Sequence, residues 1–284
     1  QTSDMKVLDK YAFDGKVLKL CMDFAFQDGE AELIEDKAGY FNRVISLTDL
    51  GRLNLIDLKN MDNGIDQLSQ LAKKHDLKEI TLVEDSISGF IQAYSYAKEM
   101  GIKLIFGLRV TITEDISDKS QASLKKESKI IIFPKNNTGY KNLIKISTIA
   151  SSTGFYYEPR LDYSTLREYY DDNLMIAIPF YDSFLFSNSL YGHLCVPDFS
   201  FFKPIFFVEE NSLPFDNIIL DKVNSYAKDK FEIQKTQSVF YYEREDFLAY
   251  LTFRCINKRT NLNKPNLEHM SSDTFCFENY LNSK

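Results

Sequence analysis

The feature of this sequence that most constrains its fold is the alternation of short apolar runs with segments of helical period. The runs are rich in Ile, Val, Leu and Phe and lack the polar alternation of a half-exposed strand. Each is therefore predicted to be a strand that is buried on both faces. The five runs are "EITLV" (79–83), "KLIFG" (103–107), "KIIIF" (129–133), "LMIAI" (174–178) and "PIFFV" (204–208).

Segments with helical spacing separate these runs. In each segment apolar residues recur every three or four positions, as expected for a helix that packs one face against a sheet. The expected helices cover about 65–72, 87–97, 140–150, 219–227 and 245–256. Thr138 and Asp216 lie at the start of two of these helices. Their side-chain oxygens are predicted to cap the first free backbone N–H groups.

The repeated strand and helix order predicts the architecture. Such repeats favour an α/β fold with a parallel sheet or barrel and right-handed crossovers. No Pro-rich or Gly-rich linker divides the chain, so residues 46–284 are predicted to form one barrel-like domain. Residues 1–45 break the rhythm, because apolar residues alternate along 16–26 and Asp28-Gly29 offers a hairpin turn. We expect these residues to form a β-rich extension that contains a β-hairpin.

Composition excludes several classes of protein. The chain has 284 residues, 44% of them hydrophobic, which is enough to bury a full core. The 34 Lys and Arg residues and the 41 Asp and Glu residues give the chain a formal net charge of -7. The chain therefore lacks the excess of positive charge that attracts duplex DNA. The 4 cysteines are far apart and suggest neither a zinc site nor a disulfide framework. No apolar run approaches the roughly 20 residues that span a bilayer, so a cytoplasmic protein is expected.

Four consecutive segments carry a resemblance to a known family. They are "AKEMGIKLIFGLRVTI" (97–112), "IIIFPKNNTGYKNLIKISTIA" (130–150), "GFYYEPRLD" (154–162) and "NLMIAIPF" (173–180). Their order resembles the polymerase and histidinol phosphatase (PHP) domain, as it occurs at the N-terminus of the bacterial DNA polymerase III alpha subunit. The resemblance extends over roughly residues 46 to 280. It implies a distorted (β/α)7 barrel, with the β-hairpin of residues 1–45 added to it.

Active members of this family hold divalent metals at the carboxyl-terminal mouth of the barrel and hydrolyse phosphoesters. Such ligands fix the ions and lower the pKa of a bound water. The resemblance assigns the metal pocket to eight positions of this chain, which are Thr48, Leu50, Glu84, Asp85, Arg109, Lys129, Ser238 and Phe240. Glu84 and Asp85 are the acidic pair that remains. At the other six positions another residue replaces the family's ligand. The resemblance therefore implies that these eight positions form a metal pocket that has lost most of its ligands.

Two of these replacements oppose metal binding directly. Arg109 stands where the resemblance expects a glutamate, and Lys129 where it expects a histidine. The 3 histidines of the chain, His75, His193 and His269, fall on none of the ligand positions. We therefore expect no catalytic residue, no metal site and no cofactor. Glu84 and Asp85 have a structural alternative, because a carboxylate pair after a strand commonly interacts with a helix N-terminus.

The aromatic residues point to a core and a protein interface. The chain has 23 Phe and 17 Tyr, and those of the C-terminal half are flanked mostly by Asp, Glu and Ser. Exposed aromatic side chains with few surrounding charges are typical of interface centres. The basic group Lys258, Arg259 and Lys264 is interpreted as a solvated face.

These observations leave three functions open. The favoured hypothesis is a catalytically inactive PHP-like domain that acts as a protein-binding scaffold in or beside a bacterial-type replicative polymerase. Its expected partner is a replication protein, such as a proofreading exonuclease or another polymerase subunit, with weak or no binding of nucleic acid. The second is a residual metal-dependent phosphoesterase or exonuclease. The third is a free-standing mimic of a polymerase domain that captures a replication protein.

Overall fold

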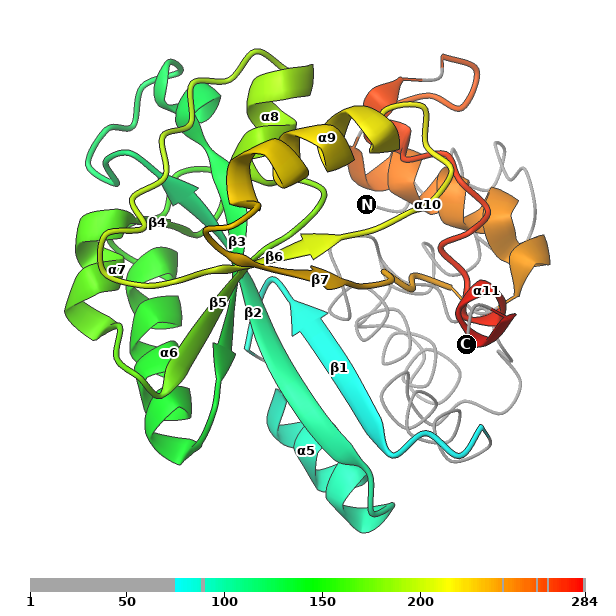
Figure 1. Ribbon diagram of the computed structural model, residues 1–284, viewed down its shortest axis with the longest axis horizontal. Coiled ribbons are helices and arrows are strands. Elements are labelled where there is room, and N and C mark those ends of the chain that lie inside the picture. The colour runs from blue at the N-terminus through cyan, green and yellow to red at the C-terminus, as the bar shows by residue number, and fades with distance from the viewer. Residues whose placement is uncertain (1–74, 88–89, 242, 259, 265, 283–284) are drawn as a thin grey trace, which may run out of the picture. The chain divides into compact units, whose positions relative to one another are not determined.

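The structure is a computed structural model that describes residues 75–87, 90–241, 243–258, 260–264 and 266–282 (Figure 1). The described residues belong to two compact units. Unit 2 comprises Thr81–Ile87 and Ile105–Gln237, and unit 1 comprises the described residues outside these two ranges. The predicted hairpin, the predicted helix at 65–72 and the extension at 1–45 lie outside the described residues.

Seven strands form one sheet. They are β1 (Glu79–Glu84), β2 (Lys103–Thr113), β3 (Ser128–Pro134), β4 (Arg160–Asp162), β5 (Leu174–Ile178), β6 (Ile205–Val208) and β7 (Glu232–Lys235). Their order across the sheet is β1-β2-β3-β5-β6-β7, and β4 pairs with β2. The five predicted strands are confirmed as β1, β2, β3, β5 and β6, although β2 extends six positions beyond the prediction, to Thr113.

The sheet is mixed, so the expectation of a parallel sheet is wrong for one strand. β3 runs antiparallel to both of its neighbours, β2 and β5, whereas β5, β6 and β7 are parallel. The physical reason lies in the connection between β2 and β3, whose one regular element is the short 3-10 helix η1 (Ser123–Lys126). A parallel pair needs a longer crossover, usually a helix, while a chain that simply turns back pairs antiparallel.

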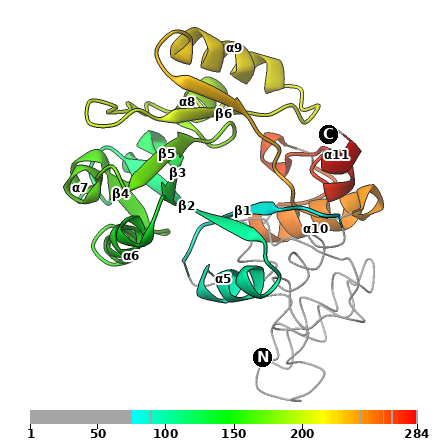
Figure 2. The ribbon, with the colours of Figure 1, turned by 60° about the horizontal axis from the view of Figure 1, so that its bottom comes forward.

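Four helices cover the outer side of the curved sheet of unit 2 (Figure 2). They are α6 (Asn137–Ser151), α7 (Tyr163–Tyr169), α8 (Phe184–Leu190) and α9 (Asp216–Ala227). Leu143 and Ile146 of α6 and Ile219 of α9 are fully buried beneath them. Unit 2 is therefore a mixed α/β structure with a curled sheet, compatible with a PHP barrel. Closure into a full (β/α)7 barrel remains a prediction.

Both predicted helix caps are wrong. Asn136 caps α6, because its Oδ1 accepts hydrogen bonds from the backbone N–H groups of Thr138 and Gly139. Asp216 is the first residue of α9, and its carboxylate accepts from the N–H groups of Asn211 and Leu213 in the preceding loop. In both cases the helix begins earlier than the apolar spacing indicated, so the residue expected at the cap lies inside the first turn.

Unit 1 contains three α-helices among its described residues, α5 (Phe90–Glu99), α10 (Phe247–Lys258) and α11 (Phe277–Asn282). Two of them confirm the predicted helices at 87–97 and 245–256, each shifted by two or three residues. Ala97 of α5 and Ile102 form a small core with Ile80 and Leu104. No helix in the described part of the chain is long and apolar enough to cross a membrane.

Most of the aromatic residues in the described C-terminal half are buried or half-buried. Phe180, Phe186 and Phe206 are at most 1% exposed, and the Phe206 ring lies 5.5 Å from that of Phe231. In the sequence these clusters indicated a core together with a protein interface. Among the described residues of this half, the structure places fewer than half of the aromatic side chains in the core and leaves most of the others half-buried.

Candidate functional site

Polar side chains of unit 2 gather at one edge of the sheet. Asp182 and Glu209 follow the parallel strands β5 and β6, so both lie at the carboxyl end of that strand pair. Because β3 is antiparallel to β5, its first residues lie at this same edge, and Lys129 is one of them. The carboxyl ends of parallel strands are where α/β folds place their ligands. This edge is therefore the candidate site.

The first contact at this edge joins β2 to the end of β1. The guanidinium of Arg109 donates to the carboxylate of Asp85 through two hydrogen bonds, Nε to Oδ1 and Nη2 to Oδ2, both 3.0 Å long. The Arg109 Nη1 atom also lies 4.0 Å from Oδ2 of Asp182. This planar, two-bond arrangement is the strongest geometry that Arg and a carboxylate can form.

The second contact joins β3 to the residue before Pro159. Lys129 donates from Nζ to Oε2 of Glu158 over 3.0 Å, and Thr111 of β2 donates to the other oxygen of Glu158 over 2.7 Å. Burial would lower the pKa of Lys129, but the carboxylates of Glu158 and Asp85 outweigh burial, and the pKa is raised above its ordinary value. Lys129 is therefore a fixed cation at neutral pH.

The six residues of these contacts form what we call the mouth cluster, namely Asp85, Arg109, Thr111, Lys129, Glu158 and Asp182. Its cations lie deeper than its acids. The side chains of Arg109 and Lys129 are 14% and 20% exposed, whereas those of Asp85, Asp182 and Glu158 are 34%, 41% and 44% exposed. The carboxylates are therefore the more solvent-accessible groups of the cluster, and the two cations lie beneath them.

A second buried network lies beside β6 and β7. Asn211 donates from Nδ2 to the Tyr181 hydroxyl over 3.0 Å and to Oε2 of Glu209 over 2.9 Å. The side-chain oxygen Oδ1 of Asn211 accepts a hydrogen bond from Nε2 of Gln237 over 2.6 Å. Tyr181 in turn donates to Asp216 over 2.9 Å. Burial, followed by the charge of Glu209, raises the pKa of Tyr181, so this hydroxyl stays protonated and acts as a structural donor.

The described members of the predicted metal pocket are divided between the two units. Asp85, Arg109 and Lys129 lie in the mouth cluster, and Glu84 is 1% exposed at the end of β1. Ser238 and Phe240 belong to unit 1, where the Phe240 ring lies 4.9 Å from that of Phe275. Thr48 and Leu50 lie outside the described residues. Both oxygens of Asp85 bond to Arg109, so ion pairing is the role that the structure gives this carboxylate.

The three histidines are not members of the mouth cluster, and each has a contact of its own. His75 packs against the Phe277 ring, His193 contacts the backbone oxygen of Glu127, and His269 contacts Thr260. Sequence reasoning missed three members of the mouth cluster, Thr111, Glu158 and Asp182. A usable signal was present for two of them, since Glu158 precedes β4 and Asp182 follows β5 within four residues of the strand.

The residues of the mouth cluster do not fit a divalent metal. Two of the side chains that face the carboxylates are already cations, and like charges at such distances repel an added metal ion. Across the described ranges no group of three or more His, Cys, Asp or Glu side chains is placed to hold a metal ion. In this edge of the sheet Arg109 and Lys129 supply the positive charge that the carboxylates require.

Comparison with known proteins places these observations in a family. The sequence profile of the PHP domain matches residues 59–233. The DNA polymerase III subunit alpha of Borreliella burgdorferi is 37% identical over 108 residues, which are 37% of this chain and 9% of that protein. The subunit of the same name from Treponema pallidum is 23% identical over 235 residues, 75% of this chain and 19% of that protein.

The relative from Aquifex aeolicus, also a DNA polymerase III subunit alpha, is 32% identical over 113 residues, 37% of this chain and 10% of that protein. The chain thus spans about a tenth of the length of the first curated relatives it matches.

Proposed function

The chain belongs to the PHP domain family, and on this basis we propose that it is a catalytically inactive member that serves as a protein-binding scaffold in or beside a replicative polymerase of bacterial type. The observation that carries the proposal is the pairing of Arg109 with Asp85 and of Lys129 with Glu158. Both cations stand at positions where the resemblance to active members expects metal ligands.

Metal-assisted hydrolysis needs ions with an open coordination position and a bound water of lowered pKa. Ammonium and guanidinium groups have no such position, because they carry only hydrogen-bond donors. The positive charge of Arg109 and Lys129 can hold the carboxylates together, but it cannot generate a hydroxide nucleophile.

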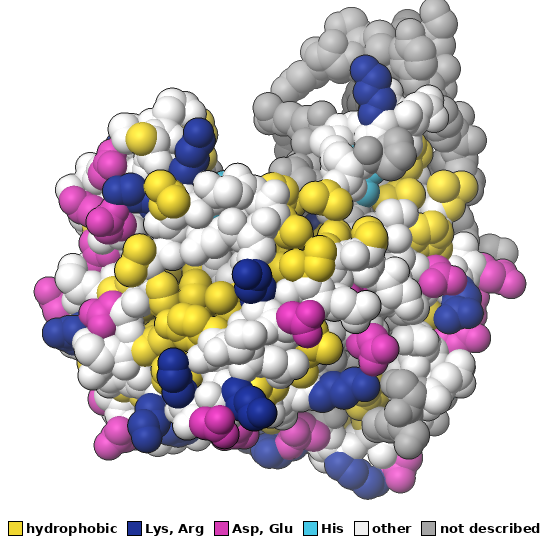
Figure 3. All heavy atoms as spheres, turned by 45° about the horizontal axis from the view of Figure 1, so that its top comes forward, with side chains coloured by type: hydrophobic (Ala, Val, Ile, Leu, Met, Phe, Trp, Pro, Cys, Tyr) yellow, Lys and Arg dark blue, Asp and Glu magenta, His cyan; other side chains and the backbone are white. Residues whose placement is uncertain are grey.

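The exposure of the cluster also opposes phosphoester binding. Three partly exposed carboxylates, those of Asp85, Asp182 and Glu158, lie above two cations that are already paired. An approaching phosphate group would meet negative charge first, so its electrostatic attraction is weak. On the face shown in Figure 3, Lys and Arg side chains are interspersed with Asp and Glu, which favours binding of protein over nucleic acid.

The scaffold role draws on the relatives and on the surface. The curated relatives are subunits of DNA polymerase III, so a replication protein, such as a proofreading exonuclease or another polymerase subunit, is the proposed partner. Apolar side chains are available at the surface of unit 2, where Leu194 and Val196 are 72% and 81% exposed. Exposed aliphatic side chains of this kind are suited to the centre of a protein interface.

The experiment pairs a hydrolysis assay with a binding assay. Chelator-treated protein is incubated with Mn²⁺, Mg²⁺ or Zn²⁺ and with phosphomonoester, phosphodiester and single-stranded DNA substrates, beside the variant Asp85→Asn. We expect no turnover in either protein. Metal-dependent turnover in the wild type that Asp85→Asn abolishes would overturn the inactive assignment.

The binding assay titrates purified replication proteins and single-stranded DNA in parallel at moderate ionic strength. The proposal predicts a protein complex that tolerates salt, and DNA binding that is weak and falls steeply as salt rises. Submicromolar DNA affinity without a protein complex would contradict the scaffold role.

A further inference from the structure

One loop of unit 2, residues 193–197, is held in place by hydrogen bonds. The backbone N–H and the backbone oxygen of Cys195 both bond to the side-chain amide of Asn188, over 2.9 Å each. The N–H of Leu194 donates to the backbone oxygen of Lys125 over 2.8 Å, which ties the loop to η1. The backbone of this loop is therefore fixed before any partner binds.

This fixed loop presents two aliphatic side chains to solvent. Leu194 and Val196 are 72% and 81% exposed, whereas Cys195 between them is 6% exposed. Alternate exposure of this kind indicates that Leu194 and Val196 share the outer side of the loop. Because the backbone is already ordered, little conformational entropy is lost when a partner covers these side chains, and this favours binding.

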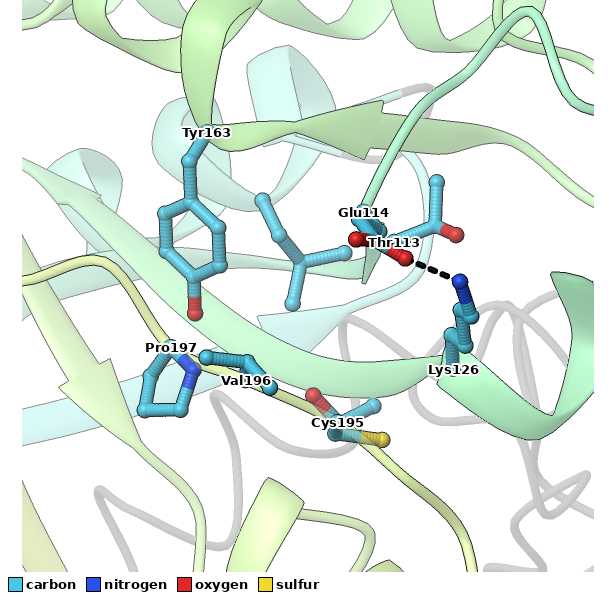
Figure 4. Close-up of a pocket in the computed structure, with 9 residues that line it drawn as sticks. Thr113, Glu114, Lys126, Tyr163, Cys195, Val196 and Pro197 are labelled. Carbon is cyan, nitrogen blue, oxygen red and sulfur yellow. Dashed lines mark hydrogen bonds and ion pairs between the residues drawn. The ribbon is translucent and has the colours of Figure 1, made fainter.

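The charged groups beside the loop leave one cation available. In residues 125–127 and 193–198, three charged side chains already form ion pairs, namely Lys126 with Glu114, Glu127 with Arg160 and Asp198 with Arg167. The Lys126 pair borders the same small pocket as Val196 (Figure 4). Lys125 is exposed, and its ammonium group forms no ion pair or hydrogen bond with the described part of the chain. A binding partner therefore meets positive charge beside two aliphatic side chains.

The three side chains of Lys125, Leu194 and Val196 form what we call the docking patch. A stable interface between folded domains covers about 800 Å² on each partner. Three side chains offer far less, so the patch suits a short peptide segment better than a second domain. Its lysine calls for a carboxylate, and its aliphatic side chains call for an apolar group.

We propose that the docking patch binds a short segment of a partner protein in which an aliphatic residue lies close to an Asp or a Glu. The aliphatic side chain packs on Leu194 and Val196, and the carboxylate pairs with Lys125. The patch contains no aromatic ring on which a base could stack, so it favours a peptide over single-stranded nucleic acid. This proposal rests on the scaffold role and specifies the chemistry of the segment that the scaffold binds.

The test selects peptides from a random library displayed on phage, with the full chain as the target. Counter-selection uses the double variant Leu194→Asp/Val196→Asp, and we expect the enriched peptides to combine aliphatic and acidic residues. Synthetic copies of these peptides should bind the double variant and Lys125→Glu at least about tenfold more weakly than the wild type. The double variant loses apolar burial, and Lys125→Glu reverses the charge.

Two matched controls test whether the effect is local. Ile218→Asp and Lys145→Glu change exposed positions of α9 and α6 and should leave peptide affinity unchanged. The Tm of every variant should stay close to that of the wild type, because all five positions are exposed. Equal loss of affinity in the controls would contradict a specific patch.

Several outcomes would overturn the proposal. They are enriched peptides that are basic, peptides that bind the patch variants as tightly as the wild type, and a library that yields no peptide selective for the wild type. Sedimentation velocity adds another, since self-association that the double variant abolishes would make the patch an interface between copies of this chain.

A titration with purified replication proteins separates this proposal from the scaffold role. If a replication protein binds and the patch variants leave its affinity unchanged, the scaffold role stands and the docking patch is refuted. If selective peptides bind the patch but no replication protein does, the patch stands and the role in replication fails.

Discussion

Arg109 holds Asp85 by two hydrogen bonds of equal length, 3.0 Å each, across 24 positions of sequence. The pair brings the end of β1 to the middle of β2, and Asp182 approaches the same guanidinium at 4.0 Å. A single arginine thus balances carboxylates from two strand ends. Under the proposed function, Arg109 compensates the charge of these carboxylates, as metal ions do in active PHP domains.

Removal of the Arg109 charge should destabilise unit 2. Arg109→Met leaves Asp85 and Asp182 facing each other without the cation, so we expect a loss of about 1–3 kcal/mol in the free energy of unfolding. The expected loss is smaller than for a fully buried ion pair, because Asp85 is 34% exposed. Urea unfolding of the wild type and the variant measures this change in the free energy of unfolding. Arg109→Lys keeps the charge without the planar fork and should lose less. Equal stability of Arg109→Met and the wild type would refute the prediction.

The pKa of Lys129 gives a prediction on pH. Because this pKa is raised in the folded state, protonation of Lys129 contributes stability that is fully present below about pH 10, the ordinary lysine range, and is lost as pH rises through the folded pKa. The difference in unfolding free energy between the wild type and Lys129→Met should be constant from pH 7 to about pH 9 and shrink above about pH 10. Lys145→Met, at an exposed position of α6, is the control. A difference that stays flat to the highest accessible pH would argue against the pairing.

Chelation should leave the fold unchanged. Since Arg109 and Lys129 already pair with carboxylates of the mouth cluster, we expect the stability not to depend on a bound ion. Thermal melts with and without EDTA, together with elemental analysis of the purified protein, provide the measurement. If EDTA lowered the Tm by several degrees and one specific metal restored it, a metal site would have to be sought.

A methyl group at Gly154 should be poorly tolerated. A Cβ atom there would lie 2.0 Å from the backbone oxygen of Arg160, and the Gly154 oxygen accepts a 3.2 Å hydrogen bond from Arg160. Arg160 is fully buried and pairs with Glu127 over 2.9 Å, so little room exists to move. Gly154→Ala should therefore cost at least about 1–3 kcal/mol, measured by chemical denaturation. Ser151→Ala, at an exposed position of α6, should be nearly neutral, and a similar effect of both changes would rule out the steric explanation.

The sequence alone determined where five of the seven strands lie. The runs at 129–133 and 174–178 appear as β3 and β5 nearly residue for residue, because a strand buried on both faces must be continuously apolar. It also identified the family, since the four quoted segments lie largely within the residues that the PHP profile matches. That Arg109 and Lys129 stand where the resemblance expects metal ligands is likewise an inference from the sequence.

The tertiary structure decided which residues meet. The antiparallel direction of β3 brings Lys129 to the edge of the sheet at which β5 ends, and there Lys129 pairs with Glu158. Thr111 reaches the same carboxylate from 47 positions away. Apolar period and helix propensity are local in sequence, whereas strand direction and ion pairing depend on contacts between distant segments. For this reason the sequence singled out Asp85, Arg109 and Lys129 of the mouth cluster, and only the folded chain joined them to Thr111, Glu158 and Asp182.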